Sequence, residues 1–168
     1  MIYLVRDFCG YTQKEAAMLL LKQGLFWEYG ISGEVDITFH EKGKPYLKDY
    51  SDIFFNYSHH KSGVLCGIAT QEIGVDIEGL IPYKERLAKR ICHPREWDRL
   101  CEEEDKSAFL TKIWTVKESY LKYLGEGIRQ DLRELDFSMC DNQMFRAKDC
   151  LFCVEQIDEL VTAVCRKY

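Results

Sequence analysis

The order of helix-forming and strand-forming segments constrains the fold more than any other feature of this chain. A strand at 1–5 precedes a helix that opens at the capping-box pattern Thr12-x-x-Glu15 and runs to about Tyr29. Strands are then predicted near 35–40, 53–58, 64–70 and 73–78. The second half adds helices near 83–91, 94–103 and 107–124, and strands near 134–139, 143–148, 150–157 and 160–166. A helix followed by an antiparallel meander, given twice, predicts an α+β fold of two similar halves.

The predicted helix at 107–124 carries polar chemistry on one stripe. Apolar residues recur through it at helical spacing, and Gly125 supplies a stop. Trp114, Glu118 and Lys122 stand at successive i, i+4 positions, so their side chains line one face. Taken alone, such a stripe is an exposed Glu–Lys pair that stabilises a helix by about 0.3–0.5 kcal/mol.

Two carboxylates on a short strand give this stripe a partner. In Gly74-Val75-Asp76-Ile77-Glu78 the strand period of two puts Asp76 and Glu78 on the same face. Two carboxylates from a strand and one from a helix are a common way to hold a magnesium ion that also binds substrate phosphates. The alternative is a half-solvated strand with an ordinary polar face.

Two further segments present groups suited to phosphate oxygens. Lys44 lies at the apex of the turn Gly43-Lys44-Pro45, where glycine and proline both favour a change of direction. Ser58 and His59 end the hydrophobic strand that begins at Phe54. A lysine, a hydroxyl and an imidazole on such turns can all donate hydrogen bonds to an anion.

The order of these motifs resembles a known family. G-K-P at 43–45, F-N-x-S-H at 55–59, G-V-D-I-E at 74–78 and W-T-x-K-E-S-x-x-K at 114–122 occur in that order. Together they are similar to the 4'-phosphopantetheinyl transferases, in particular the surfactin-synthetase type. The similarity runs from about Lys14 to Phe137, which is most of the chain.

The resemblance implies a catalytic role for each matching acid. Asp76, Glu78 and Glu118 would hold magnesium against the pyrophosphate of coenzyme A. Glu118 would also act as the general base, directly or through a water, and Lys122 would contact the phosphates. The expected reaction moves phosphopantetheine from coenzyme A to a serine of an acyl or peptidyl carrier protein and releases 3',5'-ADP.

The resemblance also implies residues for the rest of the coenzyme. Lys44, Ser58 and His59 match positions that bind the adenosine 3'-phosphate end, and Lys14 lies where many members place a basic coenzyme-binding residue. The implied fold is a pseudo-dimer within one chain, with the active site between its halves. Residues 1–80 would bind the adenosine end, and residues 81–168 would supply the catalytic helix and dock the carrier protein.

The composition is compatible with this prediction and excludes other classes. A net charge of −5 and a pI of about 5.4 argue against general nucleic-acid binding. No signal peptide or membrane span is predicted, and the eight cysteines are expected to be buried free thiols. Only Cys150 and Cys153 have metal-like spacing, and no second pair completes a zinc site. We therefore expect a cytoplasmic monomer without a membrane partner.

One basic segment stands out on this acidic chain. Residues 82–99 hold six basic side chains against three acidic ones, a net of +3. This segment is either a solvated amphipathic helix or a docking face for acidic carrier proteins.

Two other functions use the same residues. A magnesium-dependent phosphohydrolase or nuclease would turn over without a carrier protein. A protein that binds carriers without catalysis would not need Asp76, Glu78 and Glu118 together, so the presence of all three argues against it.

Overall fold

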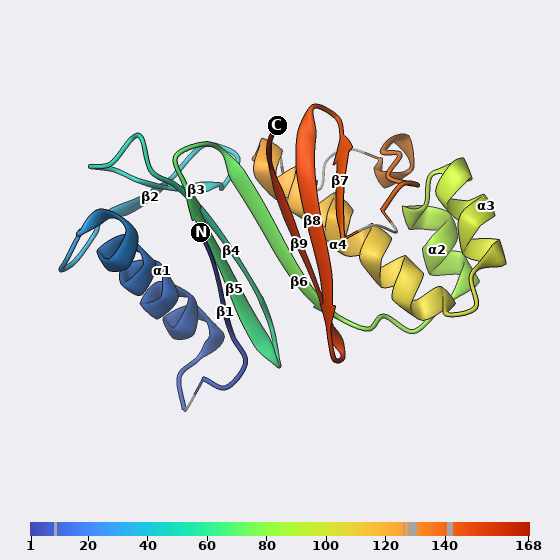
Figure 1. The fold of residues 1–168 in the computed structure, drawn as a ribbon, viewed down its shortest axis with the longest axis horizontal. Helices are drawn as coiled ribbons and strands as arrows, with labels where there is room; N and C mark the ends of the chain where they lie inside the picture. The colour runs from blue at the N-terminus through green and yellow to red at the C-terminus, as the bar shows by residue number, and fades with distance from the viewer. Residues whose placement is uncertain (9, 126, 128–130, 141–142) are drawn as a thin grey trace.

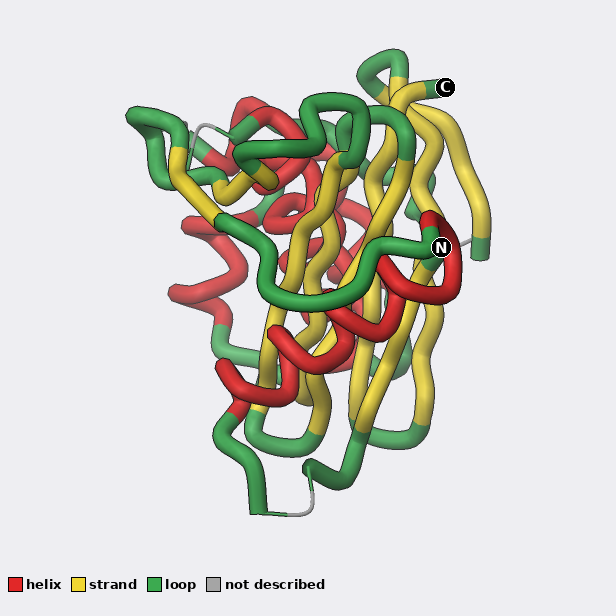
Figure 2. The backbone as a smooth tube through the Cα atoms, turned by 90° about the vertical axis from the view of Figure 1, so that its left-hand side faces the viewer, coloured by secondary structure: helices red, strands yellow, loops and turns green. Residues whose placement is uncertain are grey.

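The computed structural model describes residues 1–8, 10–125, 127, 131–140 and 143–168. Its first sheet has three antiparallel strands in the order β1 (Ile2–Val5), β5 (Gly63–Ala69) and β4 (Phe54–His60). Helix α1 (Gln13–Tyr29) covers one face of this sheet, as Figures 1 and 2 show. Thr12 closes a capping box with Glu15 at the start of α1, and Gly30 ends the helix in the left-handed conformation.

The second sheet repeats this arrangement. Its four antiparallel strands follow the order β6 (Ile73–Gly79), β9 (Leu160–Lys167), β8 (Cys150–Ile157) and β7 (Met144–Ala147). Helix α4 (Lys106–Leu124) packs on β6 and β9 (Figure 1). In each half the first strand pairs with the last, a long helix lies between them in sequence, and the second-to-last strand comes next. This shared topology confirms the predicted α+β pseudo-dimer.

The remaining elements connect these two layers. Strands β2 (Ile37–Phe39) and β3 (Pro45–Leu47) form a short hairpin. Helices α2 (Glu85–Ile91) and α3 (Pro94–Glu102) lie beside α4, and the 3-10 turn η1 covers Leu132–Glu134. The sheets divide before β6, because β6 bonds to β9 in the second sheet. The functional division at residues 80 and 81 stays a prediction.

The strand predicted near 134–139 is wrong. Leu135 and Phe137 alternate and are buried, which is the pattern that predicts a strand. The backbone instead leaves η1 and turns at Cys140, whose N–H donates to the carbonyl of Phe137. The Phe137 N–H donates to the Glu96 carboxylate at 2.7 Å, so a side chain satisfies the group that a neighbouring strand would have paired.

Strand β6 joins the two halves through opposite faces. Ile73, Val75 and Ile77 belong to an apolar cluster that includes Leu65 of the first sheet. The other face of β6 lies against α4. A Cβ atom on Gly74 would stand 2.1 Å from the carbonyl oxygen of Ser119, so only glycine allows this close approach.

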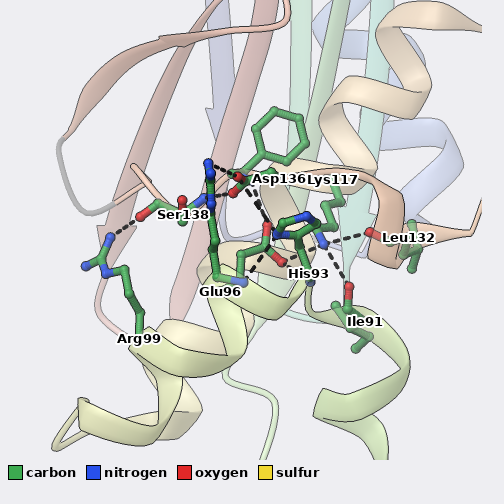
Figure 3. Close-up of polar contacts among 10 residues, drawn as sticks. Ile91, His93, Glu96, Arg99, Lys117, Leu132, Asp136 and Ser138 are labelled. Carbon is green, nitrogen blue, oxygen red and sulfur yellow. Dashed lines mark hydrogen bonds and ion pairs between the residues drawn. The ribbon is translucent and has the colours of Figure 1, made fainter.

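A buried ion pair fixes α4 in its surroundings. The Lys117 ammonium donates to Glu96 at 2.6 Å, to the Ile91 carbonyl at 2.7 Å and to the Leu132 carbonyl at 2.8 Å (Figure 3). Burial raises the pKa of Glu96 and lowers that of Lys117, while their mutual attraction acts in the opposite direction. The pair ties α4 to α2, α3 and η1, one residue before Glu118.

The burial of the cysteines confirms the prediction only in part. The described cysteines are free thiols and five of these seven are buried, but Cys101 is exposed and Cys153 is half-buried, so the expected burial is wrong for Cys101. Cys9 lies outside the described residues. None of the helices in the described part of the chain has the length and apolar character needed to cross a membrane.

Removing one member of the buried pair should destabilise the protein strongly. Lys117→Met leaves the Glu96 charge buried without its cation, and we expect a loss of about 3–5 kcal/mol in the free energy of unfolding. Lys117→Met combined with Glu96→Gln removes both charges and should recover part of that loss. Urea denaturation of the three proteins measures this, and a double variant no more stable than Lys117→Met would contradict the expectation.

Candidate active site

The polar stripe of α4 faces the two carboxylates of β6. The Trp114 indole donates to Glu78 Oε1 at 2.9 Å, and the Lys122 ammonium donates to Asp76 Oδ1 at 2.6 Å. Glu118 lies between them on the helix and is 9% exposed. The helical and strand periods therefore bring these five side chains together, as the sequence predicts.

Ser58 extends this group into the first half. Its hydroxyl donates to Asp76 Oδ1 at 2.8 Å and accepts a hydrogen bond from the Lys122 ammonium, also at 2.8 Å. The neighbouring Asn56 accepts from the Val75 N–H at 2.9 Å, which holds β4 beside β6. Asp76, 2% exposed, is thus fixed by a hydroxyl and an ammonium from two different elements.

The carboxylates are held in an unusual electrostatic environment. Burial, followed by the charge of Asp76, raises the pKa of Glu118 to about 7. Burial also raises the pKa of Glu78, and the Trp114 hydrogen bond partly opposes this. Glu118 is therefore poised to exchange a proton near neutral pH, which suits a general base.

The same environment bears on the predicted magnesium ion. Asp76 Oδ2 and Glu118 Oε1 are buried and have no hydrogen-bond partner among the described residues. Such oxygens are costly in a protein interior, and hard cations prefer them as ligands. In the part of the chain that the structure describes, no group of three or more acidic, histidine or cysteine side chains is placed so that it could hold a metal ion, and Glu78 Oε1 accepts a hydrogen bond from Trp114. Carboxylate oxygens are the donors that magnesium prefers, so the chemistry of these residues fits magnesium although their present spacing does not.

A pocket of about 310 Å³ opens beside these residues, between the halves. The first half contributes the Gly43 turn and β4, and the second contributes the last turns of α4. Its wall includes three lysines and one acid: Lys42, Lys44, Lys122 and Glu118. Lysine side chains in a pocket wall can bind an anionic ligand, although Lys44 and Lys122 already pair with Glu72 and Asp76.

Two of the predicted coenzyme-binding residues lie elsewhere. His59 is exposed, and the strand alternation of β4 turns it away from Ser58 toward the opposite face. Lys14 lines a separate surface depression on α1 with Tyr11 and Met18. The structure thus groups Lys44 and Ser58 with the acids, and does not bring His59 or Lys14 to this pocket. The period of two already separates Ser58 from His59.

Sequence reasoning missed other residues of the site. Asn56 and Tyr57 line the pocket, and Glu72 forms an ion pair with Lys44. Asn56 precedes Ser58 by two residues on β4, so the strand period could have indicated it. Nothing local in the sequence points from Glu72 to Lys44, because the contact joins two loop residues that are 28 positions apart.

The sequence is similar to known proteins of one superfamily. The sequence profile of the 4'-phosphopantetheinyl transferase superfamily matches residues 72–165, a segment that contains Asp76, Glu78, Glu118 and Lys122. The chain belongs to this superfamily. It is 38% identical over 115 residues to the 4'-phosphopantetheinyl transferase HetI of Nostoc sp., covering 64% of this chain and 48% of that protein.

One further relative and one solved structure are similar to parts of the chain. The 4'-phosphopantetheinyl transferase Sfp of Bacillus subtilis is 37% identical over 97 residues, covering 55% of this chain and 43% of that protein. A crystal structure of holo-[acyl-carrier-protein] synthase from Thermotoga maritima has a TM-score of 0.46 at 16% identity, covering 58% and 64% of the two chains. The chain spans about half the length of the curated relatives that it matches.

Neutralising Glu118 should change how stability depends on pH. Its pKa rises from 4.5 to about 7 on folding, so the folded state favours the protonated acid. The contribution of Glu118 to the free energy of unfolding is therefore fully present below about pH 4.5, and it is lost as the pH rises toward 7. With a chelator present, we expect the free energy of unfolding of Glu118→Gln to exceed that of the wild type by about 1–3 kcal/mol at pH 8. At pH 4.5 the two proteins should differ little. Urea denaturation at both pH values checks this, and parallel pH profiles would contradict it.

Proposed function

We propose that this protein transfers 4'-phosphopantetheine from coenzyme A to a serine of an acyl or peptidyl carrier protein. One observation carries the proposal. Glu118, with a pKa near neutrality, lies beside Asp76 and Lys122 in a lysine-walled pocket between two halves of this superfamily's chain.

The residues divide the chemical step between them. Glu118, directly or through a water, accepts the proton of the carrier serine as its oxygen bonds to the phosphorus that carries the pantetheine. The bond from this phosphorus to the bridging oxygen of the pyrophosphate breaks, and 3',5'-ADP leaves with that oxygen. Lys122 stabilises the charge on the phosphate oxygens, because its ammonium is held in place by Asp76 and Ser58. The protein needs no nucleophile of its own.

Magnesium would be held by Asp76, Glu78 and Glu118. The support is the pair of buried carboxylate oxygens that lack partners in the described part of the chain, together with the nearby third acid. When bound, magnesium offsets negative charge on the pyrophosphate during transfer. Trp114 positions the Glu78 carboxylate, and Ser58 orients Asp76.

The residues proposed to hold the rest of coenzyme A are supported by their position at the pocket and by the resemblance. Lys44 would bind the adenosine 3'-phosphate end, since it lines the pocket at the first-half wall. Ser58 would contribute from β4, and His59 and Lys14 would require contacts outside this pocket. In this proposal residues 1–80 hold the adenosine end, residues 81–168 carry catalysis and docking, and the enzyme works as a cytoplasmic monomer.

The proposed reaction can be tested with purified components. Apo carrier proteins from fatty-acid, polyketide and peptide synthetases are incubated with the protein, coenzyme A and magnesium, and their masses are measured. We expect one or more carriers to gain phosphopantetheine on serine. Asp76→Asn keeps the shape of the side chain but removes the charge, and should slow transfer by about 10²-fold or more.

The controls separate this function from its alternatives. A chelator should stop transfer by the wild type. Hydrolysis of coenzyme A at an equal rate without any carrier would indicate a phosphohydrolase instead. No transfer to any member of the panel would contradict the proposal.

We propose that the basic segment at 82–99 docks the carrier protein. Some of its basic side chains already form ion pairs within the protein, and others do not. Lys89 pairs with Glu85, Arg95 with Asp136 and Arg99 with Glu103. Lys84, Arg86 and Arg90 are exposed and form no ion pair among the described residues. These cations on and before α2 are the ones available to an acidic partner.

Removing two of these cations should weaken carrier binding. We expect Arg86→Ala/Arg90→Ala to raise KM for the carrier by about 3- to 10-fold, because rim charges speed encounter. The KM for coenzyme A and the kcat should be unchanged. Steady-state kinetics with the carrier varied at several salt concentrations measures this, and the wild-type KM should rise with salt.

A matched variant controls for net charge. Lys22→Ala/Lys48→Ala removes two cations from the first half and should leave the carrier KM unchanged. Equal behaviour of the two double variants, or a salt-independent wild-type KM, would contradict docking at α2.

A further inference from the structure

A carboxylate outside the proposed catalytic set reaches a lysine of the pocket. The Lys44 ammonium forms an ion pair with Glu72 and donates a hydrogen bond to the Tyr123 carbonyl at 2.7 Å. Glu72 directly precedes β6. Lys44, a pocket lysine that could bind an anionic ligand, is therefore already paired with a carboxylate of the protein.

The lysine is fixed more firmly than the acid. The Lys44 side chain is 10% exposed, and its stem lies so close to Gly125 that a Cβ there would stand 3.0 Å from Lys44 Cδ. Its ammonium also lies at the C-terminal end of α4, where the helix dipole favours a positive charge. Moving Lys44 away would forfeit these contacts.

The Glu72 carboxylate can move away from Lys44 at a lower free-energy cost than Lys44 can move. Its side chain is 44% exposed, whereas that of Asp76, the partner of Lys122, is 3% exposed. Asp76 is also held by Ser58, while Lys44 is the hydrogen-bond partner of the Glu72 carboxylate. Water can replace Lys44 around an acid that is already half exposed, so Glu72 can turn outward when another anion arrives.

We propose that Glu72 competes with the anionic ligand for Lys44 and thereby limits how tightly the pocket binds coenzyme A. The inference rests on the proposed function for the identity of the ligand. Each of these two pocket lysines is neutralised by a carboxylate, but only the Glu72 carboxylate can be displaced. Binding at Lys44 is thus an exchange of one anion for another, which lowers affinity and eases release of the product.

The test compares coenzyme A binding in the absence of carrier protein, by isothermal titration calorimetry. Glu72→Gln removes the competing charge and should tighten coenzyme A binding by about 3- to 10-fold at low salt, as expected for a partly exposed ion pair. In a Lys44→Met background, which keeps the aliphatic stem, the same Glu72→Gln change should have no effect. That loss of effect identifies Lys44 as the group through which Glu72 acts.

Glu159→Gln is the matched control. Glu159 is 53% exposed and pairs with Arg6, so its variant makes the same change of net charge on an ion pair of similar exposure. Unchanged affinity in Glu72→Gln, an equal gain in Glu159→Gln, or a gain that persists with Lys44→Met would overturn the inference. Coenzyme A binding without transfer to carriers would contradict the proposed function alone. Failure of the wild type to bind coenzyme A would overturn both.

Discussion

The close approach of β6 to α4 at Gly74 determines the rest of this structure. With no side chain at Gly74, the strand backbone can lie against the backbone of Ser119 and Tyr123. The alternate residues Asp76 and Glu78 are then carried to the helix face that bears Glu118 and Lys122. Any larger residue at this position would separate the acids from the lysine, so one contact sets both the packing of the second half and the geometry of its site.

This geometry stabilises some groups of the site at the expense of others. Lys122 and Ser58 both donate hydrogen bonds to Asp76 Oδ1, and the Trp114 indole donates to one oxygen of Glu78. The other oxygen of Asp76 and one oxygen of Glu118 are buried and accept no hydrogen bond from any residue that the structure describes. Unsatisfied carboxylate oxygens oppose folding, and they are also the groups that a cation or a serine proton would satisfy. Burial also raises the pKa of Glu118, so the ionised carboxylate opposes folding while it remains able to bind a cation or a proton.

The sequence predicts those parts of the site that follow from local periodicity. The helical period places Trp114, Glu118 and Lys122 on one face, and the strand period pairs Asp76 with Glu78. It fails where a distant side chain decides the outcome. Leu135 and Phe137 read as a strand, but Glu96, 41 residues earlier than Phe137, takes the N–H that a neighbouring strand would need. The Lys44–Glu72 pair also has no sequence signal, because a contact between two loop residues 28 positions apart follows no helical or strand period.

The two halves are joined by different forces at different places. Away from the site the contact is apolar, with Ile73, Val75 and Ile77 of β6 packed on the first sheet. At the site it is polar: Lys122 of α4 reaches Ser58 of β4, and Lys44 of β3's preceding turn reaches the last residues of α4. Both polar links end within the last turns of one helix, and neither depends on Glu72. The exposed Glu72 carboxylate can therefore leave Lys44 while the apolar contact and both polar links still hold the halves together.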